Sequence, residues 1–107
     1  MNKLKKLLNL YKQFLLVLEK EGDDQVHYAI NIIHDDLEQL EGFIKLNVDE
    51  KINIELFNKI KENYESLYPP RGGLTEFFIW REDFDERFTE NEKLNNLKKE
   101  IDDIFSS

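Results

Sequence analysis

The side chains of this 107-residue chain that could bind a metal ion gather in one stretch. His27 and His34 are the two histidines, and Glu38 and Glu41 follow them closely. In a helix these side chains share a narrow sector, because each residue turns the helix by about 100°. The two histidines would nevertheless stand about 10 Å apart along the axis, too far to share one ion. Only His34 and Glu38 have the spacing for joint coordination, so we expect a solvated helix face and no metal site.

Pairs of adjacent carboxylates could supply general acid–base chemistry. Such catalysis needs two carboxyl groups whose pKa values are pushed apart inside a cleft, whereas neighbours on a helix point about 100° apart. No catalytic-triad spacing, zinc-protease motif or phosphate-binding loop accompanies them, and the absence of Cys excludes thiolate chemistry. We therefore expect a protein that is not an enzyme and needs no cofactor. The adjacent pairs include Asp23–Asp24, Asp35–Asp36 and Asp102–Asp103.

The segment from Tyr68 to Trp80 is the least generic part of the chain, because it holds both prolines and two of the four glycines. Tyr68 and Trp80 could anchor a partner protein, and Arg71 could donate paired hydrogen bonds to a carboxylate. The segment could equally be a rigid turn whose aromatic residues fill the core. Both interpretations can hold together. The residues expected in the core are then Phe77, Phe84 and Phe88.

Acidic residues outnumber basic ones by 23 to 15, which gives a formal charge of −8. The first 18 residues carry +4, whereas residues 19–51 carry −7 and residues 76–107 carry −5. Because surface charge steers partners of opposite sign, we expect a basic protein partner and neither nucleic acid nor a membrane. Two acidic faces could steer it: the first contains Asp23, Asp24, Asp35, Asp36, Glu38 and Glu41, and the second Asp83, Asp85, Glu86 and Glu90.

Apolar residues repeat at steps of four and three along most of the chain, which is the period of an amphipathic helix. Gly22 and Gly42 follow the first two apolar stretches, as glycine often follows a helix, and Asp23 or Asp24 can cap the second helix. Pro69 stops the third, because proline lacks the amide donor. The helices predicted in this part of the chain span 2–20, 24–41 and 50–67.

Two further helices are predicted over 76–88 and 90–105. Thr75 can cap the first, and the capping-box sequence Thr-Glu-Asn-Glu at 89–92 can begin the second. The aromatic run at 77–80 lacks a helical period and could form a short strand, although no other segment offers it a partner. The sequence therefore predicts one all-α domain over residues 1–107, a mostly antiparallel bundle of four or five helices.

The last third of the chain carries the sequence Tyr-Pro-Pro-Arg-Gly-Gly-Leu at 68–74 and Phe-Ile-Trp-Arg at 78–81, followed by Glu86-Arg87 and by Asn91 with Leu94. This pattern resembles the C-terminal block of a family of small acidic bacterial proteins. Some proteins of this kind are immunity proteins, which neutralise a toxin made by the same or a sibling cell. The resemblance implies a function by binding, without chemistry of its own.

We therefore expect a cytoplasmic immunity protein that binds a cationic toxin domain, for example a nuclease. The alternative is a regulatory or structural module that self-associates through its first helix. No signal peptide or membrane span is expected, because the apolar run at 14–18 is short and charged residues follow it. The residues expected to contact the partner are Asp23, Asp24, Asp35, Asp36, Glu38, Glu41, Tyr68, Arg71 and Trp80.

Overall fold

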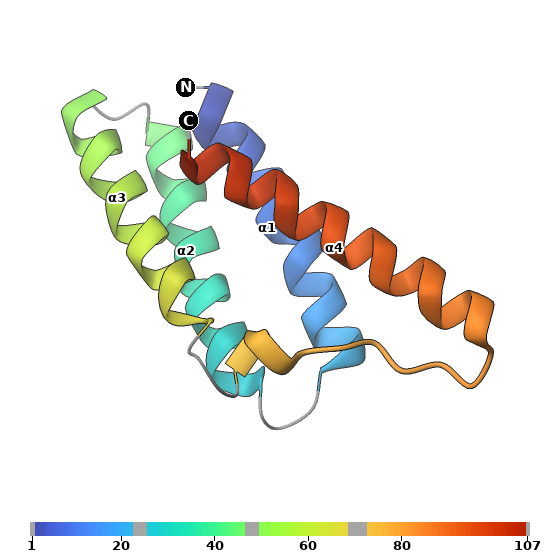
Figure 1. Cartoon of the computed structure of the whole chain (residues 1–107). Helices are drawn as coiled ribbons and strands as arrows, with labels where there is room; N and C mark the ends of the chain where they lie inside the picture. Colours follow the sequence, from blue (N-terminus) through green and yellow to red (C-terminus); the bar gives the residue numbers. More distant parts are fainter. Residues whose placement is uncertain (1, 23–25, 47–49, 69–72, 107) are drawn as a thin grey trace.

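The computed structural model describes residues 2–22, 26–46, 50–68 and 73–106 of the chain. No strand occurs within these ranges, and the prediction of an all-α bundle is confirmed, with four helices (Figure 1). No described helix combines the length and the hydropathy required to span a bilayer. The elements are α1 (Asn2–Glu21), α2 (His27–Leu46), α3 (Glu50–Ser66), the short 3-10 helix η2 (Gly73–Glu76) and α4 (Phe84–Ser106).

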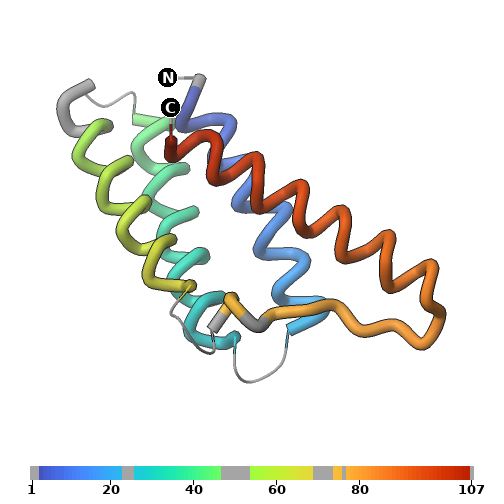
Figure 2. Tube along the Cα trace, in the orientation of Figure 1, coloured from blue at the N-terminus to red at the C-terminus, as the bar shows by residue number. Residues whose placement is uncertain are grey.

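α1 is the central helix of the bundle. It packs against both α2 and α4, and α3 packs against α2. The first three helices alternate in direction, and the beginning of α1 lies at the same end of the molecule as the end of α4 (Figures 1 and 2). The molecule is elongated, with extents of 48 × 23 × 22 Å, and the N-terminal half of α4 projects beyond the other helices (Figure 2).

Four aromatic side chains meet in the core, and we call them the buried aromatic cluster: Tyr11, Phe14, Tyr64 and Phe105. Each is at most 7% exposed, and the ring centroids in contact are 5.2 to 6.4 Å apart. They come from α1, α3 and α4, so they join three helices in one apolar centre. Tilted and edge-on ring pairs of this kind add to the stabilisation that burial itself provides.

The first helix ends at Glu21, one residue beyond its predicted range of 2–20. The backbone N–H of Gly22 donates to the carbonyl of Leu18 at 2.8 Å. A side chain at Gly22 would collide with that carbonyl and with Val26. Glycine is therefore required here by the close approach of the chain to itself.

The predicted end of the second helix is wrong. α2 passes through Gly42 and continues to Leu46, because a glycine inside a helix costs only about 1 kcal/mol and Phe43 and Ile44 pack against the core beyond it. The caps predicted at Asp23 and Asp24 lie outside the described residues. α3 matches its predicted range to within one residue.

The prediction of two separate helices over 76–88 and 90–105 is also wrong. Residues 77–83 form neither helix nor strand, and a single helix, α4, then runs from Phe84 to Ser106. Its cap is Asp83, whose side chain accepts the backbone N–H of Glu86 at 2.9 Å. The predicted capping box at 89–92 lies in the interior of α4, and Thr75 lies within η2.

Candidate protein-binding surface

Four large aromatic side chains near the start of α4 lie on the surface, and we call them the aromatic patch: Phe78, Trp80, Phe84 and Phe88. They are 55%, 65%, 65% and 62% exposed, respectively. Large apolar side chains gathered on the surface of a small protein usually mark an interaction site. The prediction that Phe84 and Phe88 lie in the core is therefore wrong, and of the alternatives for Trp80 the structure shows a surface residue.

Arg87 joins the members of the aromatic patch. Its guanidinium carbon lies 4.7 Å from the ring centroid of Trp80 and 5.4 Å from that of Phe84. A guanidinium over a ring face is attracted by the π-electrons and fixes the two groups relative to each other. The patch is therefore partly ordered before any partner arrives, which lowers the entropic cost of binding.

Residues 77–83, which we call the strap, carry Phe78 and Trp80 and are tied to α4 through one side chain. Asn91 Oδ1 accepts the backbone N–H of Ile79 at 2.9 Å, and Asn91 Nδ2 donates to the carbonyl of Ile79 at 2.8 Å. The same Nδ2 also donates to the carbonyl of Arg87 at 2.8 Å. The side-chain amide of Asn91 thus makes the two hydrogen bonds to Ile79 that a neighbouring strand would otherwise make. The side chain of Ile79 is buried and anchors the strap in the core.

A second tie joins the strap to α1. Arg81 donates from Nη1 and Nη2 to the two carboxylate oxygens of Glu21, at 2.7 and 2.5 Å. This paired geometry is the strongest that arginine forms with a carboxylate. The hydrogen bond from Arg81 lowers the pKa of Glu21, and the same bond raises the pKa of Arg81. The strap therefore holds its two aromatic side chains at a fixed place.

A cavity of about 460 Å³ opens in the aromatic patch, lined by Phe78 of the strap and by residues of α4 that include Phe84 and Phe88. Exposed carboxylates are interspersed with the patch residues along the strap and the first turns of α4, and the basic residues among them are engaged as described above. The surface thus combines an apolar centre with an acidic margin. The exposed acids are Glu82, Asp83, Asp85, Glu86 and Glu92.

The structure separates the residues predicted for the first acidic face. Asp35, Glu38 and Glu41 are exposed, and Glu41 lies 3.5 Å from the ammonium of Lys12. Asp36 belongs to the core instead, so its prediction as a surface contact is wrong. Asp23, Asp24 and Arg71 lie outside the described residues.

Asp36 is 2% exposed. Its Oδ1 accepts a hydrogen bond from Asn63 at 3.1 Å, while its Oδ2 has no hydrogen-bond partner among the described residues. Burial raises the pKa of Asp36 to about 6. The charge of Asp36 also raises the pKa of buried Tyr11, after the larger effect of burial. A carboxyl group in this position cannot steer a partner.

Tyr68 is partly buried at the end of α3. Its hydroxyl is hydrogen-bonded to that of Tyr64 at 3.1 Å, and burial raises its pKa to about 12. The ammonium of Lys98 lies 5.6 Å from the centre of its ring. Tyr68 also lines a second cavity, of about 310 Å³, together with Lys98 and Asp102.

The metal-ligating atoms of His34, Asp35 and Glu38 lie within 4.8 Å of one another on the surface of α2. His34 Nδ1 and Glu38 Oε1 are 3.8 Å apart, as their four-residue spacing predicts. All three side chains are exposed, and water competes for each of them. The trio can be explained as a solvated helix face.

Sequence reasoning missed Arg87 and Asn91 as parts of the surface. Arg87, Asn91, Trp80 and Arg81 all belong to the sequence pattern noted between residues 68 and 94, and the structure brings them into one neighbourhood. The only local signal for the exposed stripe is the four-residue spacing of Phe84 and Phe88, which is equally typical of a core stripe. The chain matches no protein-family model, no curated protein and no solved structure. Inferences about function therefore depend on the geometry of this surface.

Proposed function

We propose that this protein acts by binding a basic protein partner through the aromatic patch. The observation that supports this proposal most directly is the gathering of four exposed aromatic side chains, two on α4 and two on the strap that Asn91 and Glu21 hold in place. Tryptophan and arginine are enriched among the residues that dominate binding energies.

The acidic margin favours a basic partner over a second copy of this chain. Residues 78–92 contain six acidic and two basic residues. A two-fold contact between two patches would place these acids against each other, and like charges at an interface are costly. A basic surface would instead be attracted from a distance, which speeds association.

The more specific proposal is that the partner is a cationic toxin domain, for example a nuclease, and that the protein is its immunity protein. The family resemblance and the acidic charge support it. A nuclease presents Lys and Arg to a polyanion, and an acidic surface can occupy the same groups. Inhibition by occlusion needs no chemistry in this chain.

Self-association through the first helix is the second candidate. The apolar stripe of α1 is buried in the bundle, with Leu7, Tyr11, Phe14 and Leu18 fully covered. Leu16 remains exposed at 67%, which by itself is a small apolar contact. The aromatic patch is larger, so we rank partner binding first.

Affinity purification from the cells that produce this protein tests the proposal. The tagged wild-type chain is compared with a Trp80→Ala/Phe88→Ala variant and with an Asn96→Ala control at an exposed position about two turns further along α4. We expect wild type and control to recover a basic protein that the double variant does not recover. The recovered protein is then expressed in a test host, where it should arrest growth unless the wild-type chain is co-expressed. Equal recovery by all three chains would contradict a role of the patch, and a recovered protein that does not arrest growth would contradict the immunity role.

A further inference from the structure

A stripe of side chains runs along α4 beside the face that enters the core. Its members follow steps of four, three, four, three and four residues, the spacing of the seam between two packed helices. The buried residues of α4, such as Leu94 and Ile101, lie on a face roughly 110° away from this stripe at about 100° per residue. We call the following set the α4 stripe: Phe84, Phe88, Asn91, Asn95, Lys98 and Asp102.

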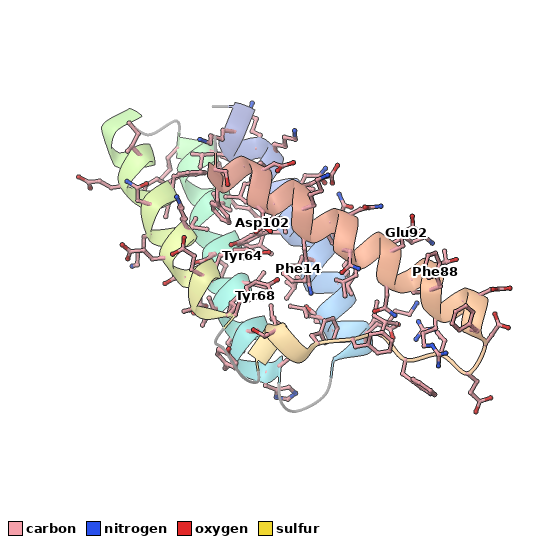
Figure 3. All side chains as sticks on the ribbon, viewed as in Figure 1. Phe14, Tyr64, Tyr68, Phe88, Glu92 and Asp102 are labelled. Carbon is pink, nitrogen blue, oxygen red and sulfur yellow. The ribbon has the colours of Figure 1, made fainter. Side chains whose placement is uncertain are left out.

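Both cavities described above open onto the α4 stripe. The first lies at its N-terminal end, at Phe84, Phe88 and Asn95. The second lies at its C-terminal end, where Lys98 and Asp102 face Tyr64 of α3 and Tyr68, which follows α3. Figure 3 shows Phe88 on the projecting half of α4 and Tyr64, Tyr68 and Asp102 between α3 and α4.

No described helix packs closely along the whole α4 stripe, although the strap is bonded to it at Asn91 and side chains from the α3 side face Lys98 and Asp102. Among the described residues, α4 packs closely against α1, and α3 packs closely against α2, whereas the backbones of α3 and α4 remain apart. The stripe spans 19 residues from Phe84 to Asp102, and the 18 steps between these two residues correspond to about 27 Å of helix. A partner helix of about five turns would match this length.

We infer that the partner places an amphipathic helix with basic flanks along the α4 stripe. This inference rests on the proposed function and names the element of the partner that makes the contact. Its apolar residues would meet Phe84 and Phe88, and its Lys or Arg residues would meet carboxylates beside the stripe. These are Asp85 and Glu92 on α4, Asp102 at its end and Glu65 on α3, all of them exposed. The mode is that of an amphipathic helix lying in a groove.

Designed peptides test this inference without the natural partner. The probe is a peptide of about 18 residues made of leucine and lysine, with leucines at alternating steps of four and three. A scrambled peptide of the same composition, a leucine–glutamate peptide of the same pattern and a peptide of half the length serve as comparisons. Trp80 is the only tryptophan of the chain and is exposed in the patch at the N-terminal end of the stripe, so its fluorescence reports a peptide that reaches this end.

We expect the full-length leucine–lysine peptide to shift the emission of Trp80 to shorter wavelength in a saturable titration. The other three peptides should bind at least about tenfold more weakly. Two adjacent asparagines provide a matched pair of variants, because Asn95 lies on the stripe and Asn96 points about 100° away from it. Both are exposed. Asn95→Arg should weaken binding of the full-length peptide at least tenfold, and Asn96→Arg should change it less than about twofold.

Four results would overturn the inference. Equal affinity for the scrambled peptide would show that charge alone is recognised. Equal affinity for the half-length peptide, or equal effects of Asn95→Arg and Asn96→Arg, would show that the stripe beyond the patch is not used. No binding of any peptide, while a partner recovered from cells still depends on Trp80 and Phe88, would reject the helix and leave the proposed function standing. The reverse result, peptide binding without a patch-dependent partner, would reject the proposed function.

Discussion

The buried aromatic cluster and the aromatic patch use the same kinds of side chain in opposite environments. Tyr11 and Phe14 are fully covered, whereas Trp80 and Phe88 are 65% and 62% exposed. The cluster joins three helices, and its rings contact one another. In the aromatic patch, two rings instead contact Arg87, and three rings line a cavity. Burial stabilises the fold in the first case, while in the second the same apolar area remains available to a partner.

Replacing one ring in each region should distinguish the two regions most clearly. Phe14→Ala removes a fully buried ring, and we expect a loss of about 3 to 5 kcal/mol in the free energy of unfolding. Phe88→Ala removes a mostly exposed ring and should change that free energy by at most about 0.5 kcal/mol. Urea denaturation followed by circular dichroism measures both. Similar losses for the two variants would show that the patch is part of the core.

The buried carboxyl group makes the stability of the core depend on pH. The pKa of Asp36 is raised from 3.8 to about 6 in the folded protein, so folding favours its protonated form. The contribution of Asp36 to stability should therefore be greatest at and below about pH 4, fall as the pH rises from about 4 to about 6, and then level off. Because a shift of one pKa unit corresponds to about 1.4 kcal/mol, the loss in the free energy of unfolding reaches about 3 kcal/mol at most.

Asp36→Asn should remove this dependence, and Asp35→Asn is its matched control, because Asp35 is exposed on the same helix. At pH 7.5 we expect Asp36→Asn to be more stable than wild type by up to about 3 kcal/mol, with little difference near pH 4. The free energy of unfolding of Asp35→Asn should stay within about 0.5 kcal/mol of that of wild type at both pH values. Destabilisation by Asp36→Asn at both pH values would contradict the account of this residue.

The strap joins the two regions, and Asn91 is its main tie. Asn91→Ala leaves the N–H and carbonyl of Ile79 without their partner, so we expect a loss of about 1 to 3 kcal/mol. Hydrogen exchange should speed up in the strap and remain unchanged in α2. Asn95→Ala, one turn further along α4, provides the control. Unchanged exchange at Ile79 in the Asn91 variant would show that other contacts hold the strap.

The sequence predicts the helical core well because every stripe repeats with a local period. Asp36 could also have been placed from that period: it lies three residues after Ile33 and four before Leu40, both fully buried. The identity of the residue, and its pairing with exposed Asp35, pointed to the surface instead. The end of α2 could not be predicted, because burial of Phe43 and Ile44 beyond Gly42 outweighs the cost of glycine.

The strap could not be predicted from local sequence, because its conformation depends on bonds to distant residues. Ile79 is bonded to a side chain 12 positions away, and Arg81 to one 60 positions away. Neither contact has a local signature. Trp80 was proposed as a candidate contact on the basis of its residue type, and the structure places it on the surface. Phe84 and Phe88 were assigned to the core because a stripe with helical spacing usually enters it.

The most direct test of the central claim measures binding and stability on the same variant. With the partner recovered by affinity purification, dissociation of the Phe88→Ala complex is followed beside its melting temperature. We expect affinity to fall by about 2 kcal/mol, or roughly thirtyfold, mainly through faster dissociation, while the melting temperature stays that of wild type. Unchanged affinity, or a loss of affinity that only accompanies a lower melting temperature, would contradict a binding role for the aromatic patch.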